Sequence, residues 1–598
     1  MKSQIAILDF GSQYTHLIAR RIRQLGVLAT IHSPQVASAA IKNVRGLILS
    51  GGPQSVHDST AIRYNKKILE LNKPILGLCY GHQLLAQAYG GQVKPGKVKE
   101  YGAASIAVKN SSPLFTGLSR RESVWMSHGD TVVRLPSGFV PIASTSDCPV
   151  AAMANDKQKR YGLQFHPEVT HSLNGLKIIE NFIFGICGCT KNWSIVAYMA
   201  ELERQIKKTV GRRKVFLLVS GGVDSTVAFA LLERVLGKSR VFGLHIDNGF
   251  LRRNESAQVK LALARAGFDD LAVVGASKKF LQAEKGVTDP EKKREIIGRV
   301  FLQVKDQVMK KNKLDNAKWM LGQGTIYPDT IETGGTKHAD TIKTHHNRVK
   351  EVLRLMRLGA LIEPLAELYK DEVRQLGKLL GLPASLLERH PFPGPGLAIR
   401  TLCATGREVV VDKSTVDAKL KKIVSAPYWA TVLPLRSVGV QGDNRTYRHP
   451  ALLTGPLNWK KIHDLSVAVT NTVAAVNRVA YVAGSVSGGQ FKIHPGLLTA
   501  ERLELLRTVD ATVTIFLRRN KLYKKIWQFP VILAPLTVCG GETIILRPVE
   551  SKEAMTVNFF AMPKRLLTEL VKKILAFEGI DAVLYDVTNK PPGTIEWE

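Results

Sequence analysis

The sequence predicts an α/β fold with two parallel-sheet α/β domains, followed by a duplicated α+β domain. In residues 1–190 and again in 191–400, apolar runs end in glycine turns and lead into helical patterns. This order is typical of a parallel sheet with helices on both faces. Residues 401–598 instead repeat short segments of their own sequence. Because a chain of 598 residues is long enough for about three to four domains, we place boundaries near residues 190 and 400.

The composition is that of a globular protein. Hydrophobic residues make up 45% and charged residues 22% of the chain, which argues against a disordered or membrane-embedded class. No apolar run approaches the roughly 18 residues of a membrane span. Met1 leads directly into a strand, so we expect neither a membrane span nor a signal peptide. Six cysteines are too few for a disulfide framework here, which favours a reducing cytoplasm.

The net charge of +34 is spread over all three regions and does not reside in a basic tail. Such a distribution favours anionic small substrates or nonspecific contact with polyanions over a dedicated nucleic-acid arm. We therefore expect no specific nucleic-acid partner.

The first region carries candidate chemistry at the end of a strand. Cys79 follows the apolar run 74–78, and active sites of parallel sheets lie at the carboxyl ends of strands. Gly77 and Gly81 flank it, as a sharp strand-to-helix turn requires. The start of the next helix would favour the nucleophilic thiolate over the thiol.

A cysteine nucleophile needs a base. His166 ends another strand, and Glu168 two residues later would orient its imidazole in the manner of catalytic triads. Taken singly, a buried cysteine is usually packing and a lone histidine usually structural.

The motifs around these residues resemble class I glutamine amidotransferases along nearly the whole first region. Ser50-Gly51-Gly52-Pro53 and Ser127-His128-Gly129-Asp130 complete the resemblance, which implies ammonia as the product. The resemblance implies these roles: Cys79 as nucleophile, His166 as general base and acid, Glu168 as orienting group, the N–H groups of Gly52 and Tyr80 as oxyanion hole, and Gln83 as a contact for glutamine.

The second region contains a glycine loop between the apolar run 215–219 and a helical pattern that begins at Thr226. Inward N–H groups and the helix start would hold a phosphate, and Asp224 would bring a carboxylate for a Mg²⁺ bridge. The loop lacks the Gly-Lys-Ser/Thr ending of a Walker A motif, and an ordinary glycine turn is the alternative. It resembles the Ser-Gly-Gly-x-Asp-Ser loop of ATP pyrophosphatases, with ATP contacts at Ser220, Gly221, Gly222, Val223, Asp224 and Ser225.

Other elements of this region surround the loop. The pattern of residues 192–208 predicts an amphipathic helix that joins the first two regions. The pattern of residues 240–249 predicts a strand that lines an adenine and ribose pocket. Residues 293–299 open a helix whose cations either approach the site or form a solvent-exposed face.

The stretch 330–347 contains Lys343, His345 and His346. We interpret it as a mobile lid that brings Lys343 onto phosphates. A zinc site at the two histidines is the alternative.

Several of these motifs together resemble the GMP synthetase family. Asp247-Asn248-Gly249, Gly324-Thr325, residues 342–347 and the segment His390-Pro391-Phe392-Pro393-Gly394-Pro395-Gly396-Leu397 match its ATP pyrophosphatase domain. The proline-glycine segment is the most specific of them.

The third region is duplicated, with a helix, two strands, a helix and a strand predicted in each copy. Three segments recur: 415–418 as 508–511, 432–435 as 532–536, and 477–482 as 581–587. In the GMP synthetase family this region dimerises, which implies a homodimer.

Residues 590–598 resemble the segment with which that family binds xanthosine monophosphate (XMP). The resemblance implies Lys590 for the phosphate and Glu596 for the purine edge, with Gln528 and Arg400 as further candidates. Glycine and proline followed by Trp597 favour a docked strand over a disordered tail.

The resemblance thus implies amination of XMP to GMP, with ATP cleaved to AMP and pyrophosphate through an adenylyl-XMP intermediate, ammonia from glutamine, and Mg²⁺ as cofactor. A tRNA-modifying ATP pyrophosphatase, with the positive charge binding RNA, is the alternative. It predicts an RNA-binding module or a sulfur-transfer cysteine near the loop, and the sequence offers neither. A nonenzymatic regulator is opposed by the intact Cys79, His166, Glu168 and Asp224.

Overall fold

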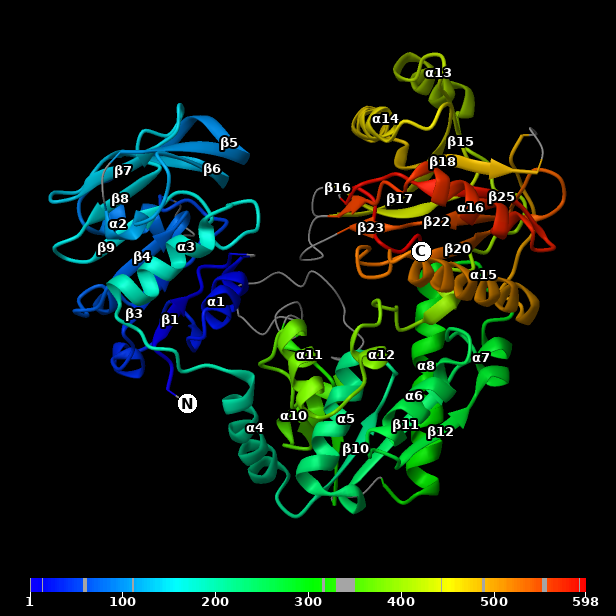
Figure 1. The fold of residues 1–598 in the computed structure, drawn as a ribbon, viewed down its shortest axis with the longest axis horizontal. Coiled ribbons are helices and arrows are strands. Elements are labelled where there is room, and N and C mark those ends of the chain that lie inside the picture. The colour runs from blue at the N-terminus through cyan, green and yellow to red at the C-terminus, as the bar shows by residue number, and fades with distance from the viewer. Residues whose placement is uncertain are drawn as a thin grey trace. The chain divides into compact units, whose positions relative to one another are not determined.

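The structure is a computed structural model. It describes residues 2–12, 14–57, 62–109, 112–314, 318–327, 329, 350–441, 444–486, 490–550, 557–590 and 592–598. Figure 1 shows the chain from its N-terminus in blue to its C-terminus in red. The chain divides into two compact units. The first comprises Met1–Thr209, Thr325–Leu353 and Glu363–Leu379, and the second Val210–Gly324, Arg354–Ile362 and Leu380–Glu598.

The first unit contains a sheet with nine strands in its described residues. They are β1 (Ile5–Leu8), β2 (Ala29–His32), β3 (Gly46–Leu49), β4 (Ile75–Leu78), β5 (Gln92–Val108), β6 (Arg121–Arg134), β7 (Val140–Ser144), β8 (Ala152–Asn155) and β9 (Arg160–Leu163). The order is β2-β1-β3-β4-β9-β8-β7-β5-β6. The predicted parallel pairing is confirmed from β2 through β9, and antiparallel strands extend the sheet beyond β9.

Apolar layers cover both faces of this sheet. Ile5 and Ile7 belong to one buried cluster, and Ala6 and Leu8 to the other, so β1 is buried on both sides. This explains its continuous apolar run, since a half-exposed strand would alternate with polar residues. The helices of the unit are α1 (Thr15–Gln24), α2 (Tyr80–Ala88), α3 (Gly175–Glu180) followed by a π-helical turn (Asn181–Ile186), α4 (Ile195–Val210), which ends one residue beyond the unit's boundary, and α11 (Lys370–Leu379).

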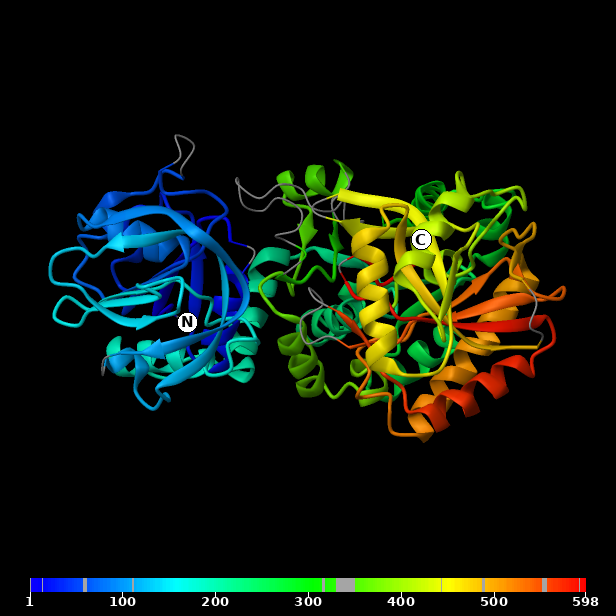
Figure 2. The same cartoon turned by 90° about the horizontal axis from the view of Figure 1, so that it is seen from above.

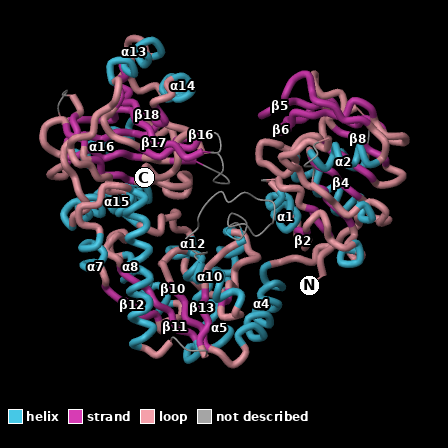
Figure 3. Tube along the Cα trace, turned by 180° about the vertical axis from the view of Figure 1, so that it is seen from behind, coloured by secondary structure: helices cyan, strands magenta, loops and turns pink. Residues whose placement is uncertain are grey.

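The second unit begins with a parallel sheet whose described strands have the order β12-β11-β10-β13-β14 (Figure 3). They are β10 (Lys214–Leu218), β11 (Val241–Asp247), β12 (Leu271–Gly275), β13 (Trp319–Gly322) and β14 (Leu361–Ile362). The chain runs outward from β10 to β12 and then returns to the other side of β10. The strand order therefore reverses at β10, where ligands bind in open α/β sheets. Its helices are α5 (Val223–Leu236), α6 (Glu255–Arg265), α7 (Ser277–Ala283), α8 (Pro290–Lys311), α10 (Lys350–Arg357), which spans the boundary between the units, and α12 (Ala384–Leu387).

The predicted duplication is confirmed in the rest of this unit. The first copy is α13 (Lys413–Ile423), β15 (Trp429–Val432), β17 (Asn444–Thr454), α14 (Trp459–Thr472) and β18 (Val476–Ser485). The second copy is α15 (Ala500–Arg519), β20 (Val531–Ala534), β22 (Glu542–Leu546), α16 (Lys564–Leu575) and β25 (Ile580–Asp586). Further strands lie within the copies or between them, namely β16 (Ser437–Gln441), β19 (Lys492–Ile493), β21 (Leu536–Thr537), β23 (Val549–Glu550) and β24 (Asn558–Phe559).

The two copies share one sheet. Its described order is β15-β17-β18-β25-β22-β20, with β16 added to β17, and Figure 2 shows its strands in yellow to red. β18 and β25 pair in antiparallel, and Tyr481 lies opposite Tyr585. These two tyrosines occupy the same position in the repeat, so the copies are related by an internal twofold axis between them.

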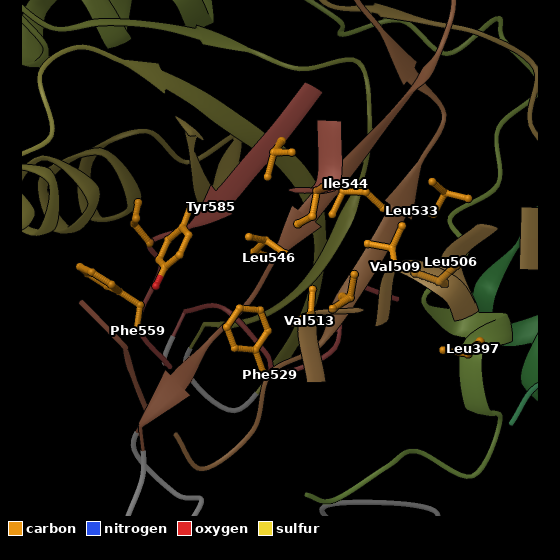
Figure 4. Packing of buried hydrophobic residues seen from close by; sticks show 14 of the residues in the cluster. Leu397, Leu506, Val509, Val513, Phe529, Leu533, Ile544, Leu546, Phe559 and Tyr585 are labelled. Atoms are coloured by element: carbon orange, nitrogen blue, oxygen red, sulfur yellow. The ribbon is translucent and has the colours of Figure 1, made fainter. Parts of the chain in front are cut away.

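The helices of the repeats supply the core against this sheet. Leu506, Val509 and Val513 of α15, at helical spacing, lie against Leu533 and Ile544 (Figure 4). An apolar stripe with this spacing packs on the inner face of the strands. Among the described residues, no helix combines the length and apolar content needed to cross a bilayer.

Candidate functional site

A sharp turn between β4 and α2 presents Cys79. Its φ of 49° lies in the left-handed region that non-glycine residues rarely adopt. A Cβ on Gly77 would lie 2.3 Å from the Gly81 carbonyl oxygen, and one on Gly81 would lie 2.4 Å from the Leu49 carbonyl oxygen. Both positions therefore need glycine, as the sequence predicts.

The structure brings Cys79, His166 and Glu168 together. The Cys79 Sγ donates to the Ser127 carbonyl at 3.4 Å, and His166 Nδ1 lies 2.7 Å from Glu168 Oε1. The His166 ring is buried and Glu168 is fully buried. Burial lowers the pKa of His166, but the Glu168 carboxylate and a hydrogen bond with Cys79 outweigh it and raise the pKa to about 10. The imidazole therefore holds a proton strongly beside the thiol.

Replacing Glu168 with glutamine is expected to lower the pKa of His166, because burial then acts without the opposing carboxylate. In the native chain the raised pKa means that this pair stabilises the fold fully below pH 6.5, the ordinary pKa of the group. The contribution is lost as the pH rises toward 10. Unfolding free energies of both proteins over this range should therefore converge at the alkaline end. A difference between the two unfolding free energies that does not change with pH would contradict the role of Glu168 in raising the pKa of His166.

The residues predicted to form the oxyanion hole and to contact glutamine lie around this turn. Tyr80 begins α2, and the first N–H groups of a helix have no carbonyl partner within the helix. A Cβ on Gly52 would lie 2.6 Å from the Phe10 carbonyl oxygen and 3.3 Å from the Tyr80 ring, so the backbone there passes close to the turn. Gln83 is buried, and its amide donates to the Asp130 carbonyl at 2.9 Å and to Gln164 at 3.2 Å.

In the second unit the loop after β10 is held by its own serines. The Ser220 N–H donates to Ser225 Oγ at 3.1 Å, and the Gly222 N–H donates to Ser220 Oγ at 3.3 Å. Gly221 has a φ of +84°. Asp224 lies in the first turn of α5. The loop thus ends at a helix start, the local structure that binds phosphates.

The neighbouring strand ends complete this site. A Cβ on Gly324 would lie 2.8 Å from the Ser225 nitrogen, so the chain after β13 passes directly over the loop. Asp247 accepts from Ser256 Oγ at 2.8 Å and from the Gly249 N–H at 3.0 Å.

A cleft of about 630 Å³ opens beside Asp247. Its lining combines cations with carboxylates: Asp247, Gly249, Leu251, Arg252, Arg253, Asn254, Glu255, Ser256, Ala257, Lys260, Val273, Glu504 and Arg507. Sequence reasoning missed its cations, although Arg252 and Arg253 closely follow Asp247-Asn248-Gly249 and offered a signal. Arg507 lies on α15, and only the fold brings it to the Gly249 carbonyl at 2.6 Å.

Three of the four predicted XMP contacts gather at the proline-glycine segment. Arg400 is buried and holds Glu596 with two hydrogen bonds of 2.7 and 2.9 Å. Its guanidinium lies 5.0 Å from the centre of the Phe392 ring, and Gln528 donates to the Pro391 carbonyl at 3.0 Å. Lys590 is placed separately, by backbone pairing with Val557.

The final residues are docked, but the predicted strand is wrong. Gly593 makes an isolated bridge with Gly439, and Trp597 is fully buried. The Trp597 indole donates to Asp586 Oδ2 at 2.8 Å, and the Arg478 guanidinium donates to the Glu596 carbonyl at 2.7 Å. Side-chain hydrogen bonds and isolated backbone contacts, such as the Val438 N–H donating to the Trp597 carbonyl at 2.9 Å, thus hold the segment in place of a continuous ladder. Two prolines within it cannot donate the N–H groups of a ladder.

The structure describes the predicted cation Lys293 but not the predicted lid residues. Lys293 is fully buried against Glu598, so the solvent-exposed alternative is wrong for this residue. The approach of the cations of 293–299 to the nucleotide site stays a prediction. The predicted lid residues Lys343, His345 and His346 lie outside the described residues.

Comparison with known proteins covers the whole chain. The family description "Glutamine amidotransferase class-I" matches residues 6–186, "NAD synthase" matches 194–282, and "GMP synthase C terminal domain" matches 516–597. A "Probable GMP synthase [glutamine-hydrolyzing]" of Leptospira interrogans is 43% identical over 100% of this chain and 99% of its own length. Proteins called "GMP synthase [glutamine-hydrolyzing]" are 38% identical in Vibrio cholerae, over 100% of this chain and 98% of theirs, and 37% identical in Aquifex aeolicus, over 99% of both. The tRNA-modifying alternative is not favoured by these names. With identity at this level along its entire length, the chain belongs to the family of glutamine-hydrolysing GMP synthases.

Proposed function

We propose that this chain aminates XMP to GMP, using ATP and ammonia released from glutamine. The observation that carries the proposal is the coexistence of two separate strand-end sites in one chain. One has the buried Cys79, His166 and Glu168, and the other has the serine-held loop with Asp224. Full-length similarity to glutamine-hydrolysing GMP synthases supports this pairing. We propose domains over 1–190, 191–400 and 401–598.

Glutamine hydrolysis would take place at Cys79. Its sulfur attacks the side-chain amide carbon of glutamine, the C–N bond breaks, and the His166 imidazolium gives a proton to the departing ammonia. The neutral imidazole then takes a proton from water, which hydrolyses the thioester and releases glutamate and the Cys79 thiolate. Glu168 keeps the imidazole oriented. The N–H groups of Gly52 and Tyr80 would bind the oxyanion. Gln83 would act through Asp130, whose carbonyl it holds.

ATP would bind with its phosphates on Ser220 to Ser225. The XMP oxygen at C2 attacks the α-phosphorus, pyrophosphate leaves, and ammonia then displaces AMP from the adenylyl-XMP intermediate. The Asp224 carboxylate would hold Mg²⁺, which prefers oxygen ligands, and the Ser220 and Ser225 hydroxyls could add two further oxygens. These two hydroxyl oxygens lie 3.0 Å apart. When bound there, Mg²⁺ would neutralise charge on the leaving pyrophosphate.

XMP would be recognised by Glu596, oriented by Arg400. Arg400 occupies one lone pair on each carboxylate oxygen, and the remaining lone pairs can accept from purine N–H groups. Gln528 would support the segment beside it, and Lys590 would pair with the phosphate.

Glu596→Gln is expected to raise the KM for XMP about tenfold or more, with the KM for ATP nearly unchanged, because the half-buried partner of the buried Arg400 and a purine acceptor are both weakened. Steady-state kinetics with ammonium as donor measures this. The nearby Glu598→Gln would not serve as a control, because it would disturb the buried contact between Glu598 and Lys293. Glu501→Gln, an exposed substitution on α15, is the matched control. An unchanged KM for XMP would place the nucleotide elsewhere.

The predicted homodimer would use a surface other than the β18–β25 pair, because the two copies already pair with each other there. We propose a reducing cytoplasm as the compartment, which fits six cysteines that are all free thiols.

The proposed function is tested by measuring GMP formation from XMP and ATP with glutamine or with ammonium as donor. Both donors should support GMP, and one AMP and one pyrophosphate should appear per GMP. AMP release without GMP in the presence of XMP would contradict the proposal.

A further inference from the structure

Lys293 is a fully buried lysine with every donor used. Its ammonium donates to Glu598 Oε2 at 2.6 Å, to the Thr401 carbonyl at 3.0 Å and to the Ala398 carbonyl at 3.3 Å. An ammonium has three N–H groups, so the site is matched to it. Burial alone would lower the pKa of Lys293, but the Glu598 carboxylate raises it. The lysine therefore stays charged at neutral pH.

These contacts join three parts of the second unit. Lys293 lies in the first turn of α8, and its two carbonyl acceptors flank Arg400. Arg400 in turn holds Glu596, two residues before Glu598. Two buried cations thus hold two neighbouring carboxylates of the same short segment.

The segment has other anchors that serve folding. Trp597 is buried in the apolar cluster with Leu402 and Leu433, and Arg478 donates to the Glu596 carbonyl. These contacts attach the segment to the sheet of the duplicated region. The Lys293 contact adds a link to α8, a helix of the region that carries the loop at 220–225, and that link is not needed to complete the sheet.

We propose that Lys293 is a positioning residue for the XMP site: by holding Glu598 it fixes the segment from which Glu596 reaches the purine. The inference rests on the proposed function, since it explains how the proposed XMP site is held in place. Lys293 would not touch the nucleotide. It acts through Glu598 and the backbone between Glu598 and Glu596.

The test uses Lys293→Met and the double variant Lys293→Met/Glu598→Gln in the full chain, with ammonium as donor. The single variant leaves a buried carboxylate unpaired, whereas the double variant removes both charges and preserves their volume. We expect the KM for XMP to rise about tenfold or more in both variants, with the KM for ATP within about twofold. Hydrogen–deuterium exchange of residues 592–598 should accelerate while that of β18 and β25 does not change.

Lys292→Met is the matched control, because Lys292 is exposed on the same turn of α8, and it should behave as the native chain. A double variant with native KM for XMP and native exchange would overturn the inference, and so would an equal rise in both KM values, which indicates general destabilisation. In either case native GMP formation by the unmodified chain leaves the proposed function standing. An unmodified chain that forms no GMP would overturn the proposed function and this inference with it.

Discussion

Replacing Cys79 with alanine is expected to abolish glutamine-dependent GMP formation and to leave ammonium-dependent formation within about twofold of native. The Cys79 thiol at the β4–α2 turn is the proposed nucleophile for the amide of glutamine, because a thiolate is the most nucleophilic of the side chains there. The loop at 220–225 follows a strand of a different sheet, so its chemistry does not depend on this sulfur. Initial rates with each nitrogen donor measure the two activities separately.

Cys539→Ala is the matched control, because Cys539 is exposed and distant in sequence from both strand-end sites. It should retain both activities. If Cys79→Ala lost both activities equally, the two-site interpretation would fail, since the ammonium-driven reaction requires no thiol in the proposed chemistry. Retained glutamine-dependent synthesis would remove Cys79 from its proposed role.

Features of this chain that depend on local geometry could be predicted from its sequence. Gly77 and the glycine loop after β10 follow from steric and helix-terminus requirements among neighbouring residues, whereas Gly81 is required by the Leu49 carbonyl of another strand. The duplication could be found because a repeat compares the sequence with itself. Its most specific consequence, Tyr481 lying opposite Tyr585, follows from pairing equivalent strands around a twofold axis.

Long-range partners could not be predicted. The Lys293–Glu598 pair spans 305 residues, and the Arg400–Glu596 pair spans 196. A charged residue on a helix is usually solvent-exposed, so the sequence pattern could not distinguish that outcome for Lys293 from an approach to the site, and it did not indicate a buried ion pair. Such pairs depend on how whole domains pack, which sequence periodicity does not encode.

Which chain segments pack together in each compact unit also depends on long-range contacts. Residues 363–379 belong to the first compact unit, and the predicted domain of 191–400 stays a prediction. There the Tyr369 hydroxyl donates to the His16 carbonyl at 2.7 Å. The docked segment at 592–598 is a further case, because its side-chain anchors replace the strand pairing that its composition favoured.

Asp224→Asn is expected to slow pyrophosphate release by about 10²-fold with either nitrogen donor, a barrier increase of about 2.7 kcal/mol. Asparagine keeps the size of the side chain and the helix start but removes the negative charge that would hold Mg²⁺ against the phosphates. Pyrophosphate release with XMP and ammonium isolates this step from glutamine hydrolysis. Raising the Mg²⁺ concentration should recover part of the rate, because a weaker site fills at higher metal concentration.

Asp306→Asn, an exposed substitution on α8, removes the same charge from the second unit away from the loop and should leave the rate unchanged. Basal glutamine hydrolysis at Cys79 should also persist in Asp224→Asn, because its nucleophile and base belong to a separate sheet. A loss smaller than tenfold, or about 1.4 kcal/mol, would show that Asp224 is not the metal ligand. A large loss that no Mg²⁺ concentration relieves would instead assign the carboxylate to holding the loop, whose serines bond to each other across Gly222.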